Sequence, residues 1–125
     1  MATIGYTYTA DTGSNDDSIA IYSWAALTTT NTDGSPISIV PFADRCVQVT
    51  GTFGAGGSIS VQGSNDGTNY AILKNAQGTA ATFTAAGIQQ IVELPRYMRP
   101  LVTAGDGTTS LTATLVARRA NPLRT

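Results

Sequence analysis

The segment Gly57–Leu73, with the sequence GSISVQGSNDGTNYAIL, constrains the fold of this chain more than any other stretch. Ile59 and Val61 alternate with serine and glutamine, and this period of two predicts a strand with one buried face. Residues 64–67 then read Ser-Asn-Asp-Gly, in which Asn and Asp favour a turn and the glycine can adopt a positive φ. The chain returns as a second strand at 69–73. The segment therefore predicts a β-hairpin with a loop of roughly three or four residues.

The rest of the chain contains further strand-like segments, separated by residues that favour turns. They lie at residues 19–27, 37–40, 45–53, 88–94, 101–104 and 109–118. In the last segment, the alternation predicts that Leu111, Ala113, Leu115 and Ala117 all face the core. Residues 3–9 also alternate, which predicts either a first strand or an extended arm.

The composition favours an all-β domain, because charged residues make up only 12% of the chain and small or turn-forming residues are frequent. We predict an antiparallel two-sheet β-sandwich over residues 19–119, with a jelly roll as the favoured topology. A closed barrel and an immunoglobulin-like Greek key stay open as alternatives, since sequence spacing does not define strand order. Residues 1–18 are expected to form an N-terminal arm or a first strand plus loop, and 120–125 an exposed C-terminal tail.

The charge argues against a nucleic-acid-binding protein, because the net charge is −1 and phosphate binding needs a cluster of cations. Acidic residues lie mostly early in the chain, and five of the six arginines lie late, from Arg96 to Arg124. This asymmetry indicates either ordinary solvated surface or a basic end that meets an acidic partner or a neighbouring copy. The first residues do not resemble a signal peptide, and no apolar run approaches a membrane span. We therefore expect synthesis in a cytoplasm and no membrane partner.

The residues that catalysis or metal binding would require do not form a recognisable pattern. The sequence contains no histidine, its single glutamate, Glu93, lies in a predicted strand, and its aspartates lie mostly in turns. Cys46 is alone and is expected to be a small core or half-buried residue without a base beside it. We predict no enzymatic activity, no cofactor and no metal site, although a loose Ca²⁺ site among Asp11, Asp16 and Asp17 is a weaker alternative.

Aromatic residues raise the possibility of carbohydrate binding, through stacking on a platform of exposed rings. The candidates are Trp24, Tyr6, Tyr8, Tyr22, Tyr70 and Tyr97. Trp24 also fits a buried position in the 19–27 strand, where it shares a face with Tyr22, opposite Ile19 and Ile21. We favour this core position for Trp24.

Two segments resemble parts of phage virion proteins. The segment SISVQGSNDGTNYAIL resembles a strand–SNDG–strand unit of many phage virion proteins and, more loosely, of discoidin-type sandwich modules. The segment IVELPRYMRPLVTAGDGTTSLTATLVARR resembles the second half of small jelly-roll decoration (cement) proteins of tailed bacteriophage capsids. The resemblance covers roughly Val47–Arg119.

This resemblance implies a structural virion protein that binds the outer surface of a phage capsid and stabilises it. Its partners would be the major capsid protein and copies of itself, as a homodimer or homotrimer, and it would be located on the capsid exterior. The alternative is a carbohydrate-binding or tail-associated adhesion module. As contact residues we predict Tyr6, Tyr8, Arg96, Tyr97, Arg99, Arg118 and Arg119. The segment Pro95–Pro100 is expected to link two strands, and Tyr97 has the alternative role of packing against the sandwich.

Overall fold

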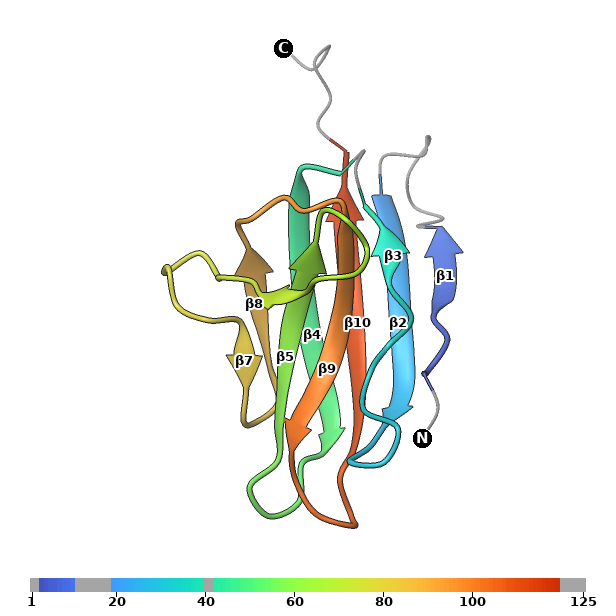
Figure 1. Cartoon of the computed structure of the whole chain (residues 1–125), viewed down its shortest axis with the longest axis vertical. Helices are drawn as coiled ribbons and strands as arrows, with labels where there is room; N and C mark the ends of the chain where they lie inside the picture. Colours follow the sequence, from blue (N-terminus) through green and yellow to red (C-terminus); the bar gives the residue numbers. More distant parts are fainter. Residues whose placement is uncertain (1–2, 11–18, 40–41, 120–125) are drawn as a thin grey trace.

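The computed structural model describes residues 3–10, 19–39 and 42–119, and these form an all-β sandwich of two antiparallel sheets (Figure 1). In chain order the strands are β1 (Thr7–Ala10), β2 (Ile19–Leu27), β3 (Ile37–Ser38), β4 (Asp44–Thr52), β5 (Ser58–Ser64), β6 (Ala71–Ile72), β7 (Thr82–Phe83), β8 (Gly87–Ile91), β9 (Tyr97–Ala104) and β10 (Ser110–Arg118). The predicted C-terminal tail at 120–125 lies outside the described residues.

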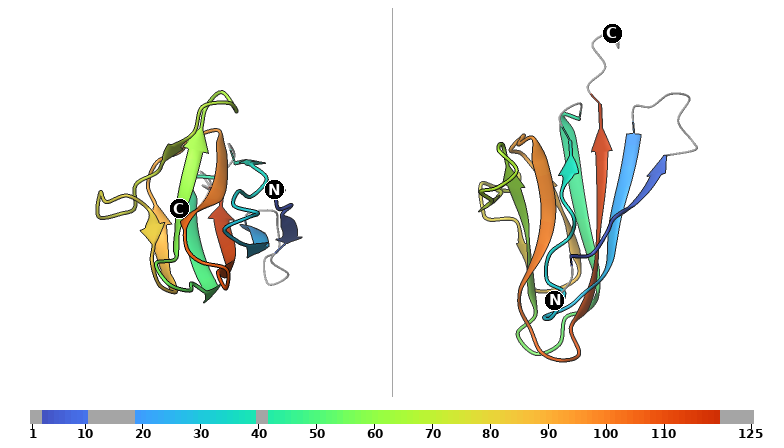
Figure 2. Two further views of the ribbon diagram at one scale, coloured as in Figure 1. Left: turned by 60° about the horizontal axis from the view of Figure 1, so that its bottom comes forward. Right: turned by 45° about the vertical axis from the view of Figure 1, so that its right-hand side comes forward.

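The two sheets have the strand order of a jelly roll. The first sheet has the order β1-β2-β10-β4-β8, and the second has the order β3-β9-β5-β6, with β7 also paired to β5. Successive strands β2 to β5 alternate between the two layers, and the late strands β9 and β10 insert between early ones (Figure 2). This interleaving of two Greek keys confirms the jelly roll among the predicted topologies.

The core lies between the two sheets and is built from alternate residues of each strand. All four β10 residues predicted to face inward, Leu111, Ala113, Leu115 and Ala117, are buried. Burial of a leucine or isoleucine side chain contributes about 1.5–3 kcal/mol, so these alternating positions supply much of the driving force for folding.

Trp24 occupies the core position predicted for it, with 2% of its surface exposed. Its indole Nε1 donates a hydrogen bond to the carbonyl oxygen of Ser35 at 2.9 Å, so the polar atom of the buried ring is satisfied. Beyond Trp24 a β-bulge interrupts the alternation, because the register with β10 shifts between Leu111 and Ala113. Ala26 lies in this bulge with φ of 61°, and the next residue, Leu27, faces the core.

The predicted hairpin is confirmed, since β5 pairs antiparallel with β6, but its loop is longer than expected. The loop covers residues 65–70, because Asp66 stabilises an open turn instead of a tight one. Its carboxylate accepts hydrogen bonds from the backbone N–H groups of Thr68 and Asn69, both at 2.8 Å. Gly67 has φ of 80°, as the turn requires. The prediction that only one face of β5 is buried is wrong at Ser60, which is buried together with its neighbours Ile59 and Val61. The Ser60 hydroxyl lies 2.9 Å from the hydroxyl of Thr82.

Two other segments differ from the sequence-based prediction. Residues Tyr97–Ala104 form one continuous strand, so the second half of Pro95–Pro100 belongs to β9 and is not a link. Pro100 lies within this strand although it has no N–H to donate, and its carbonyl accepts the N–H of Gly34 at 3.0 Å. For residues 3–9 the sequence predicted either a first strand or an extended arm. The structure shows a strand, because Thr7–Ala10 pair with β2 at the edge of the sheet.

Candidate functional site

The structure places the seven predicted contact residues in three separate regions. Arg96, Arg118 and Arg119 lie together at one end of the sandwich, at the top of Figure 1, where β10 ends and β4 and β9 begin. Tyr97 and Arg99 lie on the outer side of β9 in the second sheet, and Tyr6 and Tyr8 lie at the β1 edge of the first sheet. The predicted set therefore does not form one site.

The three arginines at the end of the sandwich form what we call the basic end. Backbone hydrogen bonds tie them to the loop before β4, because the N–H of Ala43 donates to the carbonyl of Arg118 at 3.0 Å. The N–H of Ile39 likewise donates to the carbonyl of Arg96 at 2.9 Å. The guanidinium of Arg119 lies 5.8 Å from the ring centre of Phe42.

A surface hollow of about 430 Å³ opens at the basic end. It is lined by Phe42, Ala43, Arg45, Asn65, Leu94, Pro95 and Arg96. Leu94 is 59% exposed, so the hollow combines an apolar wall with cationic groups. Such a surface suits a protein partner that carries acidic residues around an apolar contact.

Arg45 forms the base of this end and was not predicted as a functional residue. Only 2% of its surface is exposed, and its guanidinium donates to the carbonyl oxygens of Ile39 at 3.0 Å and Phe42 at 2.9 Å. It also donates to the carbonyl of Pro95 at 3.2 Å, which links the loop before β4 to the loop before β9. Burial lowers the pKa of Arg45 from its ordinary value. The sequence does indicate that Arg45 is buried, because Arg45, Val47 and Val49 are spaced two residues apart and therefore lie on the same inward face of the strand.

Arg99 is held by groups of its own chain on the outer face of the second sheet. Its guanidinium lies 3.9 Å from the centre of the Tyr70 ring and 3.9 Å from the carboxylate of Asp33, and its Nε donates to Gln62 at 3.0 Å. Tyr97 is contacted by Arg96, whose guanidinium carbon lies 5.0 Å from the ring centre. These contacts give Arg99 and Tyr97 structural roles, and their role as partner contacts stays a prediction.

The tyrosines of the β1 edge form a small aromatic cluster. The ring centres of Tyr6 and Tyr8 lie 5.5 Å and 5.3 Å from that of Tyr22. Burial, together with the neighbouring Tyr8 and Tyr6, raises the pKa of Tyr22. Tyr6 and Tyr8 are 45% and 53% exposed, so this cluster is accessible at the surface.

The carboxylates of Glu93, Asp66 and Asp106 stabilise turns and loops through hydrogen bonds. Glu93 lies beyond the end of β8, not inside a strand as predicted, and its carboxylate accepts the N–H of Lys74 at 2.7 Å. Hydrogen bonds from Thr108 and Ala55 lower the pKa of Asp106 to about 2, and those from Asn69, Thr68 and Ser64 hold the pKa of Asp66 well below its usual range.

No group of three or more His, Cys, Asp or Glu side chains is arranged to hold a metal ion within residues 3–10, 19–39 and 42–119. Asp11, Asp16 and Asp17, the residues of the alternative calcium site, lie outside these ranges. The same ranges contain no helix that is long and apolar enough to cross a membrane.

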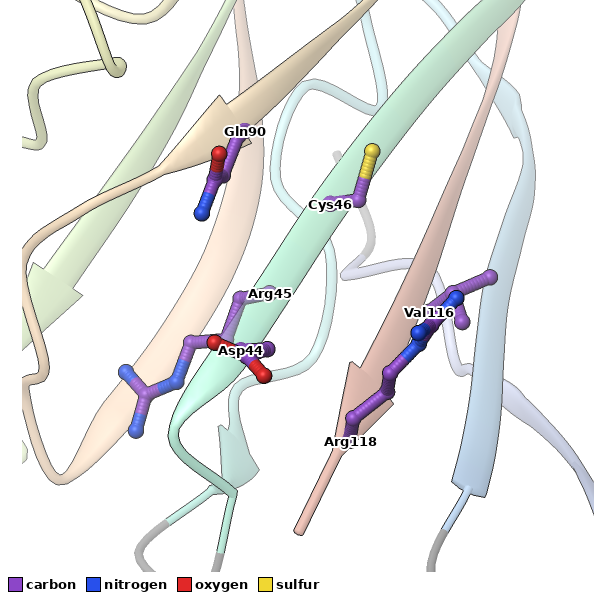
Figure 3. Close-up of a pocket in the computed structure, with 6 residues that line it drawn as sticks. All are labelled: Asp44, Arg45, Cys46, Gln90, Val116 and Arg118. Carbon is purple, nitrogen blue, oxygen red and sulfur yellow. The ribbon is translucent and has the colours of Figure 1, made fainter. Parts of the chain in front are cut away.

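A second hollow, of about 390 Å³, lies on the outer face of the first sheet (Figure 3). It is lined by Asp44, Arg45, Cys46, Gln90, Val116 and Arg118. Cys46 is half-buried there, which confirms its predicted position. Burial raises the pKa of its thiol, with an opposing effect of Arg118.

Comparison with known proteins identifies a shared fold and no family. No family model matches the chain, and no curated protein sequence matches it. The chain is similar in structure to the SPBc2 prophage-derived protein YomS, with a TM-score of 0.57, 10% identity, and coverage of 79% of this chain and 93% of that protein. At this identity the match shows the fold alone.

Two further structures match with a TM-score of 0.45, which is too low to support an argument. One is Peruvianin-I, a cysteine peptidase from Thevetia peruviana latex, at 17% identity over 94% of this chain and 64% of that one. The other is a cleaved adhesin domain of Lys-gingipain from Porphyromonas gingivalis, at 12% identity over 94% and 85%.

Proposed function

We propose that this protein is a structural component of a phage virion that binds the outer surface of the capsid and stabilises it, without catalytic activity. The observation that carries the proposal is the basic end, where Arg96 lines a hollow with an apolar wall and Arg45 binds the two loops beneath it. Arg118 and Arg119 lie at the same end of the sandwich, where β10 ends. The resemblance of residues 47–119 to decoration proteins and the jelly-roll fold shared with a prophage-derived protein support it.

The physical argument is that a decoration protein acts through many modest contacts repeated by the symmetry of the capsid. A preorganised end loses little conformational entropy on docking, because the Arg45 hydrogen bonds already fix the loops. The exposed guanidinium groups would guide the protein to acidic residues of the major capsid protein, and this contribution is weakened by salt.

The test is co-sedimentation of the purified protein with expanded capsids of the phage that carries its gene. We expect binding that weakens as salt concentration rises, and an increase in the thermal stability of the capsids. Arg96→Glu should lower the affinity by about fivefold or more, whereas Thr103→Glu, which introduces a carboxylate at an exposed position near the opposite end of β9, should change it little. Failure of the wild-type protein to co-sediment would refute the proposal.

The alternative of a carbohydrate-binding or adhesion module has less support, because Trp24 is buried and Tyr70 is covered by Arg99. The exposed pair Tyr6 and Tyr8 is the aromatic surface that such a function would use. Glycan binding that is lost in a Tyr6→Ala and Tyr8→Ala double variant would favour this alternative over capsid decoration.

A further inference from the structure

The outer face of the first sheet is almost without charge. The register of its five strands aligns the outward side chains in two rows. One row contains Thr9, Ile21, Val116, Cys46 and Gln90, and the other contains Thr7, Ser23, Thr114, Gln48 and Ile88. None of these ten side chains, which we call the flat face, is charged. In contrast, the outer side of the second sheet carries Arg99 with Asp33.

The flat face has the composition of an association surface and lies at the centre of the outer side of the first sheet. Solvent-facing strands that stay monomeric usually carry charged residues, which oppose contact between sheets. Here Ile88 is 64% exposed at one margin, and Ile21, Cys46 and Val116 form a half-buried centre. With strands about 4.8 Å apart and about 3.3 Å per residue, the flat face measures about 300 Å², and the whole outer side of the five strands measures about 570 Å². A standard protein interface buries about 800 Å² on each partner, so the flat face can form the centre of one and the whole outer side of the sheet most of its area.

The charges that border the flat face indicate what covers it. Asp44 and Arg118 are opposite charges on the adjacent strands β4 and β10, and they are register partners at one end of the sheet (Figure 3). A twofold axis that runs parallel to the strands, between β10 and β4, would place Arg118 of one copy against Asp44 of the other. The same axis would place Val116 against Cys46 and Thr114 against Gln48.

We propose that the flat face binds a second copy of this chain, in a symmetric dimer in which the two first sheets pack face to face. The interface is self-complementary in charge, as a twofold contact requires. Sheets that pack in this way lie about 10 Å apart and nearly aligned. The dimer would leave Arg96 and Arg119 outside the contact, so it goes beyond the proposed capsid binding and is tested separately from it.

The test is the association state in solution, measured by sedimentation velocity over a range of concentrations. We expect the wild-type protein to form a dimer. Thr114→Arg, which introduces a charge at the centre of the flat face, should weaken the dimer at least tenfold. Thr103→Arg is the matched control, because Thr103 is an exposed threonine of β9 in the second sheet, and it should leave the dimer unchanged. Circular dichroism would verify that both variants are folded.

Two measurements test the predicted geometry. In the proposed dimer Val116 of each copy covers Cys46 of the other, so a maleimide should label Cys46 more slowly in the wild-type protein than in Thr114→Arg. Asp44→Arg should weaken the dimer severalfold, and the double variant Asp44→Arg and Arg118→Asp should restore it.

A wild-type protein that stays monomeric, forms a trimer, or forms a dimer insensitive to Thr114→Arg would overturn the inference. Capsid co-sedimentation of Thr114→Arg is independent of these results. A monomeric variant that still binds capsids would leave the proposed function in place, and a dimer that ignores capsids would refute the proposed function alone.

Discussion

Replacing Arg45 by methionine should destabilise the protein strongly, although Arg45 forms no ion pair among the described residues. Methionine has a similar length and fills the same buried space, but it cannot donate hydrogen bonds. The change therefore isolates the contribution of the guanidinium to the loops that precede β4 and β9.

The expected loss follows from the acceptors that would be left without a partner. The guanidinium donates to three buried carbonyl oxygens, those of Ile39, Phe42 and Pro95. A buried acceptor left unsatisfied costs about 1–3 kcal/mol. The carbonyl of Ile39 retains the N–H of Phe42, and the variant no longer buries a charge, so part of the loss is offset. We expect a decrease of about 3–4 kcal/mol in the free energy of unfolding, against about 5–15 kcal/mol for a typical domain.

Urea unfolding followed by circular dichroism would measure this decrease, and thermal unfolding should show a drop of about 10 °C. Arg96→Met is the control, because Arg96 is exposed at the same end, and we expect it to cost less than about 1 kcal/mol. An Arg45→Met variant that unfolds within about 1 kcal/mol of the wild type would show that water or loop rearrangement satisfies these carbonyls.

Further predictions concern single positions. Trp24→Phe should cost about 2 kcal/mol in urea unfolding, since it leaves the carbonyl of Ser35 without its indole donor and creates a small cavity. Because the pKa of Asp106 is lowered to about 2, its contribution to stability is present above the pKa of about 4 of the unfolded chain and is lost as pH falls through about 2. In Asp106→Asn this part of the acid dependence should be absent, and an unchanged acid profile would contradict the assignment. Ala26→Gly should maintain or raise the free energy of unfolding, because Ala26 has a positive φ of 61°, which glycine adopts more easily than alanine. Ala25→Gly should lower it by about 0.5–1 kcal/mol, and equal losses in the two variants would argue against the bulge.

The parts of the fold that were predicted correctly depend on residues that are close together in the sequence. The inward face of β10 and the core position of Trp24 follow from alternation within one strand. The extended loop at 65–70 and the start of β9 at Tyr97 did not follow, because they depend on side-chain acceptors and on strands distant in sequence. Asp66 accepts hydrogen bonds from two N–H groups of its loop, and the carbonyl of Pro100 in β9 accepts the N–H of Gly34, which is distant in sequence.

The candidate site was predicted in its residue types but not in its arrangement. The late arginines indicated a basic region, yet Arg99 lies apart from Arg96 and is paired with Asp33 and Tyr70. Arg45 occupies an inward-facing position of its strand. In the sequence, however, an arginine at this position suggests only the end of a strand, because the carbonyls that it binds are not known without the structure. Those carbonyls come from residues 39–42 and from residue 95, which the strand order brings together.

The sequence by itself determined that this chain forms strands and which face of most of them is buried, because the period of two is a local property that each strand carries on its own. Only the tertiary structure decided which strands are neighbours, and therefore that Arg96, Arg118 and Arg119 gather at one end and that ten uncharged side chains form one face. The physical reason is that backbone hydrogen-bonding groups are the same on every strand, so strand order depends on how all the inward faces pack together in one core.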